Sequence, residues 1–189
     1  IWEEQLQRGV AAEISQALME EVYTTPKPGL VDREDTGAHT DMNCQTFQKS
    51  TEAIAEDLAA MFEAGYSWEA DPKTLFPLLR ERGKKTEEKM FVATGGVNTH
   101  KGIIFTIGIL AAAAGISLRN YGKIESEDVC RISLEMTKKE LEQDLRKLKQ
   151  SSGITHGEKI YCHLGEKGVR GLAMSGYPIL CERTVPHMK

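Results

Sequence analysis

The chain has 189 residues, a length typical of one domain, and this excludes an assembly of several large domains. It carries 24 Lys and Arg against 28 Asp and Glu, a formal net charge of −4, together with 40% apolar residues. This balance is typical of a folded globular protein, and it excludes a disordered chain or a general binder of polyanions.

Cysteine usage and the N-terminal residues indicate the compartment. Four cysteines lie too far apart for a thiolate metal site, so we expect reduced, mostly buried thiols at Cys44, Cys130, Cys162 and Cys181. No basic region followed by an apolar one begins the chain, which predicts a cytoplasmic rather than a secreted protein. Because there is no initiator Met, we expect a chain cut from a longer protein or a fusion.

Two helices are predicted in the first third of the chain. The first extends to about residue 21, because apolar residues recur every four positions at Leu6, Val10, Ile14 and Leu18. The second has the same spacing from Phe47 to Phe62 and ends near Gly65. Residues 23–43 between them have no periodicity, and connections this long in a compact domain are usually functional or disordered. We therefore expect a functional loop there.

The middle of the chain predicts two short helices and one apolar helix. The short helices are expected at residues 75–79 and 86–92. Residues 102–118 then form a run of 17 without a charge. This run contains three glycines and stands alone among amphipathic neighbours, so we predict a central helix buried on all sides rather than a membrane span.

The last third begins with Ser126, a residue type that favours the N-cap of a helix. The predicted apolar stripe of this helix is Leu134, Leu141, Leu145 and Leu148. Its solvated face is Lys138, Lys139, Arg146, Lys147 and Lys149, and residues 151–153 end it. A short helix is predicted at 156–164, before an irregular glycine-rich stretch at 165–176.

No segment shows the alternation of a strand, so the predicted fold class is all-α. We expect a single domain over residues 1–189, a bundle of about six to eight helices around the buried apolar helix. The functional loops are expected to line one cleft.

The first polar segment is the predicted loop at 23–43. Within ten residues it holds Asp32, Asp35, His39 and Asp41, and its prolines stiffen the backbone that presents them. Carboxylates of this kind suit Mg²⁺, which prefers one or two of them together with substrate phosphates. The alternative is a structural turn, in which Asp41 caps a helix and the other aspartates form turns.

The second polar segment, residues 94–102, directly precedes the apolar helix. Gly95 and Gly96 allow backbone amides to approach a phosphate, the helix N-terminus adds partial positive charge, and Lys101 adds a full one. The segment predicts a phosphate site but lacks the residue order of a P-loop. The alternative is a connector in which Asn98 and His100 cap the helix.

The third segment extends from His156 to Gly176. Arg170 stands between glycines and can bind a phosphate or carboxylate with two hydrogen bonds. A surface loop explains the same residues equally well.

Taken together, these segments resemble the triphosphoribosyl-dephospho-coenzyme A synthase family. The resemblance is carried by EVYTTPKPGLVD at 21–32 with GAHTDM at 37–42, and by TGGVNTHKG at 94–102. THGE at 155–158 and VRG at 169–171 match more weakly. Two long, unusual strings in this order are far more specific than a lone glycine pattern.

The resemblance implies an all-helical enzyme that transfers the triphosphoribosyl group of ATP to 3′-dephospho-coenzyme A and releases adenine. Its product is the precursor of the prosthetic group on the acyl carrier protein of citrate lyase, or of malonate decarboxylase in related systems. That carrier protein or its transferase is thus the expected downstream partner. We expect no nucleic-acid or membrane partner, and a homo-oligomer is left open.

Loss of adenine from the anomeric carbon builds oxocarbenium-like charge, so the site needs an acid for the leaving base and a carboxylate facing the ribose. The attacking 2′-hydroxyl needs a base. We assign Asp41 the role of base or stabiliser, and we place His39 or His100 near the adenine or the attacking hydroxyl.

The remaining candidates are expected to bind the substrates. The triphosphate is expected to be held by Lys27, Lys101 and the amides of Gly95 and Gly96. Mg²⁺ is expected to be positioned, directly or through water, by Asp32 and Asp35. Further hydrogen bonds to substrate are expected from Asn98, Thr99 and Arg170.

Two departures from the family pattern leave other functions open. Family members are longer, so the resemblance implies a chain that lacks the C-terminal part of the family. Leu172 also stands where the pattern shows an acidic residue. A nucleotide- or coenzyme-binding module without turnover therefore remains an alternative, as does a helical metal-dependent nucleotide hydrolase in which water replaces the acceptor.

Overall fold

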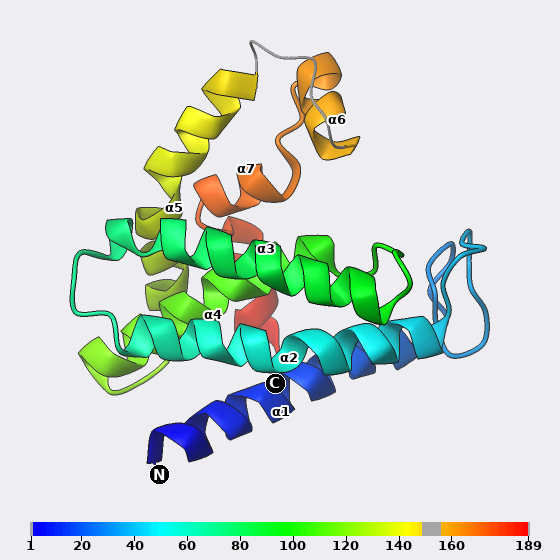
Figure 1. Cartoon of the computed structure of the whole chain (residues 1–189). Coiled ribbons are helices and arrows are strands. Elements are labelled where there is room, and N and C mark those ends of the chain that lie inside the picture. Colours follow the sequence, from blue (N-terminus) through cyan, green and yellow to red (C-terminus); the bar gives the residue numbers. More distant parts are fainter. Residues whose placement is uncertain (1, 149–155, 189) are drawn as a thin grey trace. The chain divides into compact units, whose positions relative to one another are not determined.

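The computed structural model describes residues 2–148 and 156–188, and within these ranges it contains seven α-helices and no strand (Figure 1). The helices are α1 (Trp2–Tyr23), α2 (Cys44–Tyr66), α3 (Phe76–Ala93), α4 (Lys101–Tyr121), α5 (Ser126–Leu148), α6 (His156–Leu164) and α7 (Gly168–Met174). Short helical turns are η1 (Pro72–Thr74), η2 (Leu180–Thr184) and η3 (Val185–His187). The predicted all-α class is confirmed.

The chain divides into two compact units. The first unit consists of Ile1–Glu63 and Leu79–Ala111, and the second of Ala64–Leu78 and Ala112–Lys189. The single domain expected over residues 1–189 stays a prediction, because a division into compact units does not test it.

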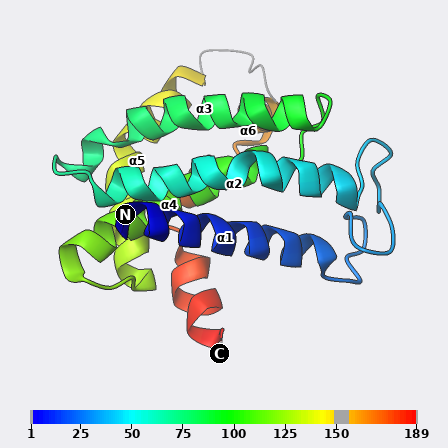
Figure 2. The ribbon, with the colours of Figure 1, turned by 60° about the horizontal axis from the view of Figure 1, so that its bottom comes forward.

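In the first unit, α1, α2 and α3 lie side by side in both views (Figures 1 and 2). The apolar stripe predicted for α2 is buried, with Ile54, Leu58, Met61 and Phe62 almost completely inaccessible. Polar bonds also join α3 to α2: the Asp57 carboxylate accepts a hydrogen bond from Thr86 Oγ1 at 3.1 Å and pairs with Lys89 Nζ at 2.7 Å. These contacts hold the C-terminal half of α3, which leads into the second polar loop, against α2.

The prediction of two short helices at 75–79 and 86–92 is wrong, because α3 is one continuous helix from Phe76 to Ala93. The polar residues between the two expected helices form its solvated face, and Glu81 pairs with Lys84 one turn later at 2.7 Å. Gly83 lies within the helix with open space around its Cα. A single glycine weakens a helix by only about 1 kcal/mol, so it does not end this one.

The prediction that residues 102–118 are buried on all sides is also wrong. The buried face of α4 includes Ile104, Ile109, Ala112 and Ile116, but Gly102 and Ile103 are exposed. Of its apolar window, with a mean hydropathy of 1.9, 44% is buried. By length and composition alone α4 is able to cross a membrane, a test that the core helix of a soluble protein also passes.

In the second unit, α5 packs against α7, η1 and η2. It begins at Ser126 as predicted, and its buried residues are Cys130, Ile132, Ser133, Met136, Thr137, Leu141 and Leu145. Leu134 of the predicted stripe is only half-buried, whereas the predicted basic residues from Lys138 to Lys147 are exposed. Lys149 and residues 151–153 lie outside the described residues.

The prediction that the glycine-rich stretch 165–176 is irregular is wrong in part, because residues 168–174 form α7. Ala173 is completely buried, and its carbonyl oxygen accepts a hydrogen bond from Thr137 Oγ1 of α5 at 3.4 Å. A Cβ at Gly176, just after this helix, would lie 3.3 Å from Leu134 Cβ of α5, so this glycine serves packing as well as the turn. The helix predicted at 156–164 is confirmed as α6.

The prediction of four reduced thiols is wrong for one pair, because Cys130 and Cys181 form a disulfide with their Cα atoms 6.6 Å apart. The two residues are separated by 51 positions in the sequence, and the packing of η2 on α5 brings them together. Short spacings identify metal sites but do not predict such distant pairs. Cys44 and Cys162 are half-buried and lie outside this disulfide.

We predict that Gly65→Ala lowers the free energy of unfolding by about 1 to 3 kcal/mol, because overpacking moves backbone or side chains. A Cβ at this position meets the backbone carbonyl of Ala112 in α4, which has little room to move. Gly83→Ala is the matched control, since its Cβ meets nothing, and it is expected to stabilise the helix by about 0.5 to 1 kcal/mol. Denaturant unfolding of both variants checks this prediction, and equal effects contradict it.

Candidate functional site

Two loops of the first unit lie at the same end of its helices (Figures 1 and 2). The first loop, residues 24–43, joins α1 to α2, and the second loop, residues 94–100, joins α3 to α4. Both contact the first two turns of α2. Cys44 Sγ donates a hydrogen bond to the Asp32 carbonyl oxygen at 2.7 Å. From the second loop, His100 Nδ1 lies 2.7 Å from Ser50 Oγ, and its ring packs edge-on against Phe47.

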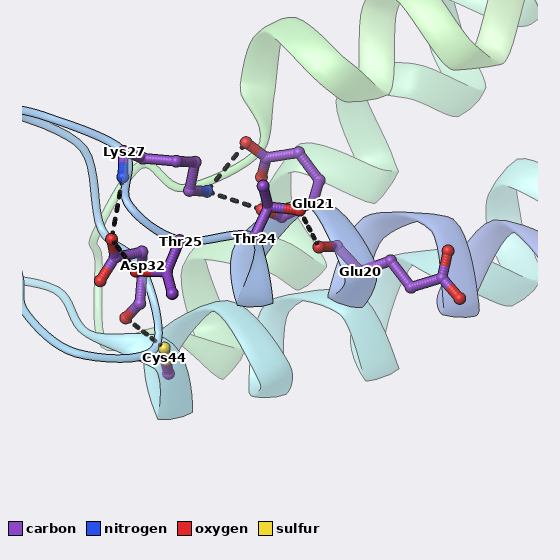
Figure 3. Close-up of polar contacts among 7 residues, drawn as sticks. All are labelled: Glu20, Glu21, Thr24, Thr25, Lys27, Asp32 and Cys44. Carbon is purple, nitrogen blue, oxygen red and sulfur yellow. Dashed lines mark hydrogen bonds and ion pairs between the residues drawn. The ribbon is translucent and has the colours of Figure 1, made fainter. Parts of the chain in front are cut away.

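Asp32 organises the first loop through its carboxylate (Figure 3). Its Oδ2 accepts hydrogen bonds from Thr25 Oγ1 at 2.6 Å and the Lys27 amide at 3.0 Å. Its Oδ1 accepts from the amides of Glu34 at 2.8 Å and Asp35 at 3.0 Å. Led by the bond from Thr25, these bonds lower the pKa of Asp32 far below its ordinary value. Asp32, only 5% exposed, is therefore a charged anchor of the loop.

These bonds decide how the two candidate metal ligands fit Mg²⁺. A carboxylate offers about four lone-pair positions, and four donors occupy those of Asp32. Direct ligation by Asp32 therefore does not fit. Asp35 is exposed, and only its Oδ1 has a bond shown, from the Gly37 amide at 2.6 Å. No group of three or more potential metal ligands is present within the part of the chain that the structure describes.

We predict that Asp32→Ala makes the first loop at least about tenfold more sensitive to limited proteolysis, because hydrogen bonds to a buried carboxylate are strong and four are lost together. Asp35→Ala, which removes only the bond from Gly37, is expected to have a much smaller effect. Mass spectrometry locates the cleavage within residues 24–43. The effect is expected to be the same with Mg²⁺ and with a chelator. A difference that appears only with Mg²⁺ would identify Asp32 as a metal ligand.

The two lysines predicted to hold a triphosphate each have a carboxylate partner. Lys27 Nζ donates to the carbonyl oxygen of Glu21 at 2.8 Å and to its Oε1 at 2.9 Å (Figure 3). Lys101 Nζ pairs with Glu87 Oε2 of α3 at 2.9 Å. Each lysine is therefore held in place by its carboxylate. An ammonium group has three N–H donors, so Lys101, whose side chain is 43% exposed, remains accessible to a ligand.

The glycines of the second loop end α3. Gly95 and Gly96 have φ values of 66° and 93°, which side chains rarely tolerate. Their amides donate to the carbonyl oxygens of Val92 and Phe91, the latter at 2.7 Å. Asn98 Oδ1 accepts from the Lys101 amide at 3.3 Å, so the expected capping contact at the start of α4 is present. Binding of phosphate by the two glycine amides stays a prediction, and it requires their present bonds to open.

His39 and Asp41 lie together in the first loop. Asp41 Oδ1 is 3.9 Å from His39 Nδ1, and their side chains are 59% and 40% exposed. At this separation they form an ion pair contact but no hydrogen bond, so proton transfer between them requires the two side chains to move roughly 1 Å closer. Both groups are accessible to a ligand.

His100, in contrast, is buried, with 4% of its surface exposed. Burial lowers its pKa to about 4, and the charge of Glu21 opposes this shift only in part. The imidazole is therefore neutral at pH 7. Ser50, its partner, was not among the residues that the sequence singled out. A signal was present, because Ser50 is a polar residue on the apolar stripe between Phe47 and Ile54.

The third polar segment belongs to the second unit. Arg170 Nη2 of α7 donates to Glu158 Oε1 of α6 at 3.1 Å, and both residues are half-buried. Leu172, at the position where an acidic residue was expected, is partly exposed on α7. The guanidinium that was expected to bind substrate is thus held by a carboxylate.

Comparisons with known proteins agree with the motifs. The family model of ATP:dephospho-CoA triphosphoribosyl transferase matches residues 7–189. Proteins named "Probable 2-(5''-triphosphoribosyl)-3'-dephosphocoenzyme-A synthase" from Streptococcus pyogenes serotypes M3 (strain MGAS315) and M4 (strain MGAS10750) are each 38% identical over 197 residues. These alignments cover 96% of this chain and 67% of each relative. No solved structure matches. The chain belongs to the ATP:dephospho-CoA triphosphoribosyl transferase family.

Proposed function

We propose that this chain transfers the triphosphoribosyl group of ATP to 3′-dephospho-coenzyme A and releases adenine. Family membership supports the reaction, and one structural observation carries its location. The two loops with the most specific motifs are both attached to the first turns of α2, through Cys44 for the first loop and Ser50 for the second. Segments that lie far apart in the sequence thereby form one candidate site.

The reaction requires the bond between the ribose C1′ and adenine to break and a bond from C1′ to the acceptor 2′-hydroxyl oxygen to form. The hydroxyl proton goes to a base, and the leaving adenine takes up a proton. We assign Asp41 to the base or to stabilisation of the ribose cation, with His39 beside it. Both side chains are exposed, as groups that touch a substrate must be.

The triphosphate is proposed to lie near the second loop. Lys101 supplies an accessible ammonium, Lys27 supplies a positive charge at the first loop, and Gly95 and Gly96 let the backbone approach the phosphates. Hydrogen bonds to substrate are proposed for Asn98 and Thr99. For Arg170, which belongs to the second unit, binding of a substrate phosphate or carboxylate is a separate proposal.

Mg²⁺, when bound, would neutralise charge on the triphosphate, and its ligands would be mainly phosphate oxygens. Asp35 is the proposed protein carboxylate, directly or through water, because Asp32 is occupied by its four donors. We place the reaction in the cytoplasm, and its product would serve the acyl carrier protein of citrate lyase.

The experiment is a chromatographic assay of adenine released from ATP, with and without dephospho-coenzyme A. Release that requires dephospho-coenzyme A is the expected result. Release without the acceptor would instead identify a nucleotide hydrolase, and ATP binding without any release would identify a binding module.

A further inference from the structure

A chain of three polar side chains crosses from the second loop to α2. Thr99 Oγ1 donates a hydrogen bond to Ser50 Oγ at 2.7 Å, and Ser50 Oγ is 2.7 Å from His100 Nδ1. Ser50 is 0% exposed, so water does not reach its hydroxyl. Both its partners lie about fifty residues further along the chain, so these bonds connect separate segments rather than neighbouring turns.

The direction of this chain follows from the proton count once Thr99 is the donor to Ser50. A serine hydroxyl has one proton to donate and accepts through its oxygen lone pairs. Because Ser50 accepts from Thr99, its own proton has one partner left among the contacts shown, the Nδ1 atom of His100. A buried hydroxyl whose proton stayed unbonded would lose its hydrogen bond to water without a replacement, which destabilises the fold.

We propose that Ser50 is a positioning residue of the site, which holds the His100 ring with its proton on Nε2 and thereby fixes the second loop for ATP. The consequence for ATP rests on the proposed function, whereas the hydrogen-bond pattern does not. His100 directly precedes α4, and its carbonyl oxygen accepts the hydrogen bond from the Ile104 amide at 2.8 Å. The His100 backbone thus begins the hydrogen-bond ladder of α4 directly before Lys101, and the bond from its ring to Ser50 holds this residue against α2.

The surroundings of His100 agree with an uncharged ring in one orientation. Phe47 of α2 packs edge-on against it at 5.1 Å between ring centroids, and its backbone amide is directed at Met90 Sδ of α3 at 3.2 Å. Burial holds its pKa at about 4, so Nδ1 remains free to accept at neutral pH. Glu21 of α1 is the charged group shown to act on the ring, and it favours the protonated form only in part.

Heteronuclear NMR of the isotope-labelled parent protein tests the hydrogen-bond pattern without any turnover. The correlations between ring nitrogens and carbon-bound ring protons are expected to show an unprotonated Nδ1 and a protonated Nε2 for His100. His100→Asn assigns the signals by their loss. A protonated Nδ1 in the parent protein overturns the proposal.

Ser50→Ala is expected to abolish the preference of His100 for the form protonated on Nε2. It is also expected to raise the KM for ATP about three- to tenfold, the effect of losing a buried hydrogen bond. Thr51→Val is the matched control, because Thr51 is also buried in α2 and its Oγ1 has no hydrogen-bond partner among the described residues. It removes a hydroxyl at almost constant volume and is expected to change neither the His100 signals nor the KM. Ser50→Thr keeps a hydroxyl and is expected to give the His100 signals and the KM for ATP of the parent protein.

The remaining outcomes also decide the question. Equal changes of the His100 signals in Thr51→Val and Ser50→Ala would show a general packing effect and would overturn the proposal. The expected signals with an unchanged KM would overturn the positioning role. If the parent releases no adenine, the proposed function fails, and calorimetric ATP affinity of the same variants replaces KM. Should Ser50→Ala not fold, the parent spectrum and Ser50→Thr still test the pattern.

Discussion

Asp41→Asn is expected to slow adenine release by about 10² to 10⁴, the usual loss when a general acid or base is removed. Asn keeps the shape of Asp but neither accepts a proton nor carries the charge that stabilises the ribose cation. Among the contacts shown for the described residues, the partner of Asp41 is His39 at 3.9 Å, which Asp41 itself would orient and which therefore does not replace it. The loss should appear in kcat more than in the KM for ATP.

Glu34→Gln is the matched control, because Glu34 is an exposed carboxylate of the same loop and its amide, not its side chain, is bonded to Asp32. Its activity should stay close to that of the parent. Steady-state measurement of adenine at saturating ATP and dephospho-coenzyme A gives both values. An Asp41→Asn rate within about threefold of the parent would remove Asp41 from the chemistry.

The second large effect concerns His100 and pH. In the unfolded chain its pKa has the ordinary value of 6.5, whereas in the folded chain burial lowers the pKa to about 4. Between these values the unfolded state binds a proton that the folded state excludes, so stability falls as the pH is lowered. The loss is about 2 kcal/mol by pH 5 and about 3 kcal/mol by pH 4, at roughly 1.4 kcal/mol per pKa unit.

His100→Asn is expected to remove this part of the pH dependence, since Asn does not titrate. Denaturant unfolding of parent and variant at pH 7 and pH 5 compares the two slopes, and any constant cost of losing the ring cancels. The other four histidines, His39, His156, His163 and His187, are present in both proteins and do not contribute to the difference. Parallel stability curves from pH 7 to pH 5 would show that His100 is not held neutral by burial.

Periodicity predicted the helices where apolar residues face one core. The stripes of α1 and α2 recur every three or four residues, so both helices and the long loop between them could be predicted. The full length of α3 and the presence of α7 could not, because polar residues separate the two apolar runs of α3 and glycines dominate the stretch that holds α7. The disulfide between Cys130 and Cys181 depends on tertiary packing that no local pattern encodes.

The candidate site could be predicted in its residue types but not in its bonding. Sequence alone shows that Asp32 and Lys27 lie in a polar loop, but not that their partners are within that loop and at the end of α1. Ser50 escaped notice because one small polar residue on an apolar stripe is a weak signal. The role of this buried hydroxyl can be inferred only when its partner, fifty residues further along the chain, is known.

Hydrogen exchange with ATP tests most directly whether the two loops bind one nucleotide. The amides of residues 24–43 and those of residues 94–100 should become protected together, with the same midpoint in ATP concentration. Protection of only one loop, or of residues 156–188 without either loop, would contradict a shared site at the start of α2.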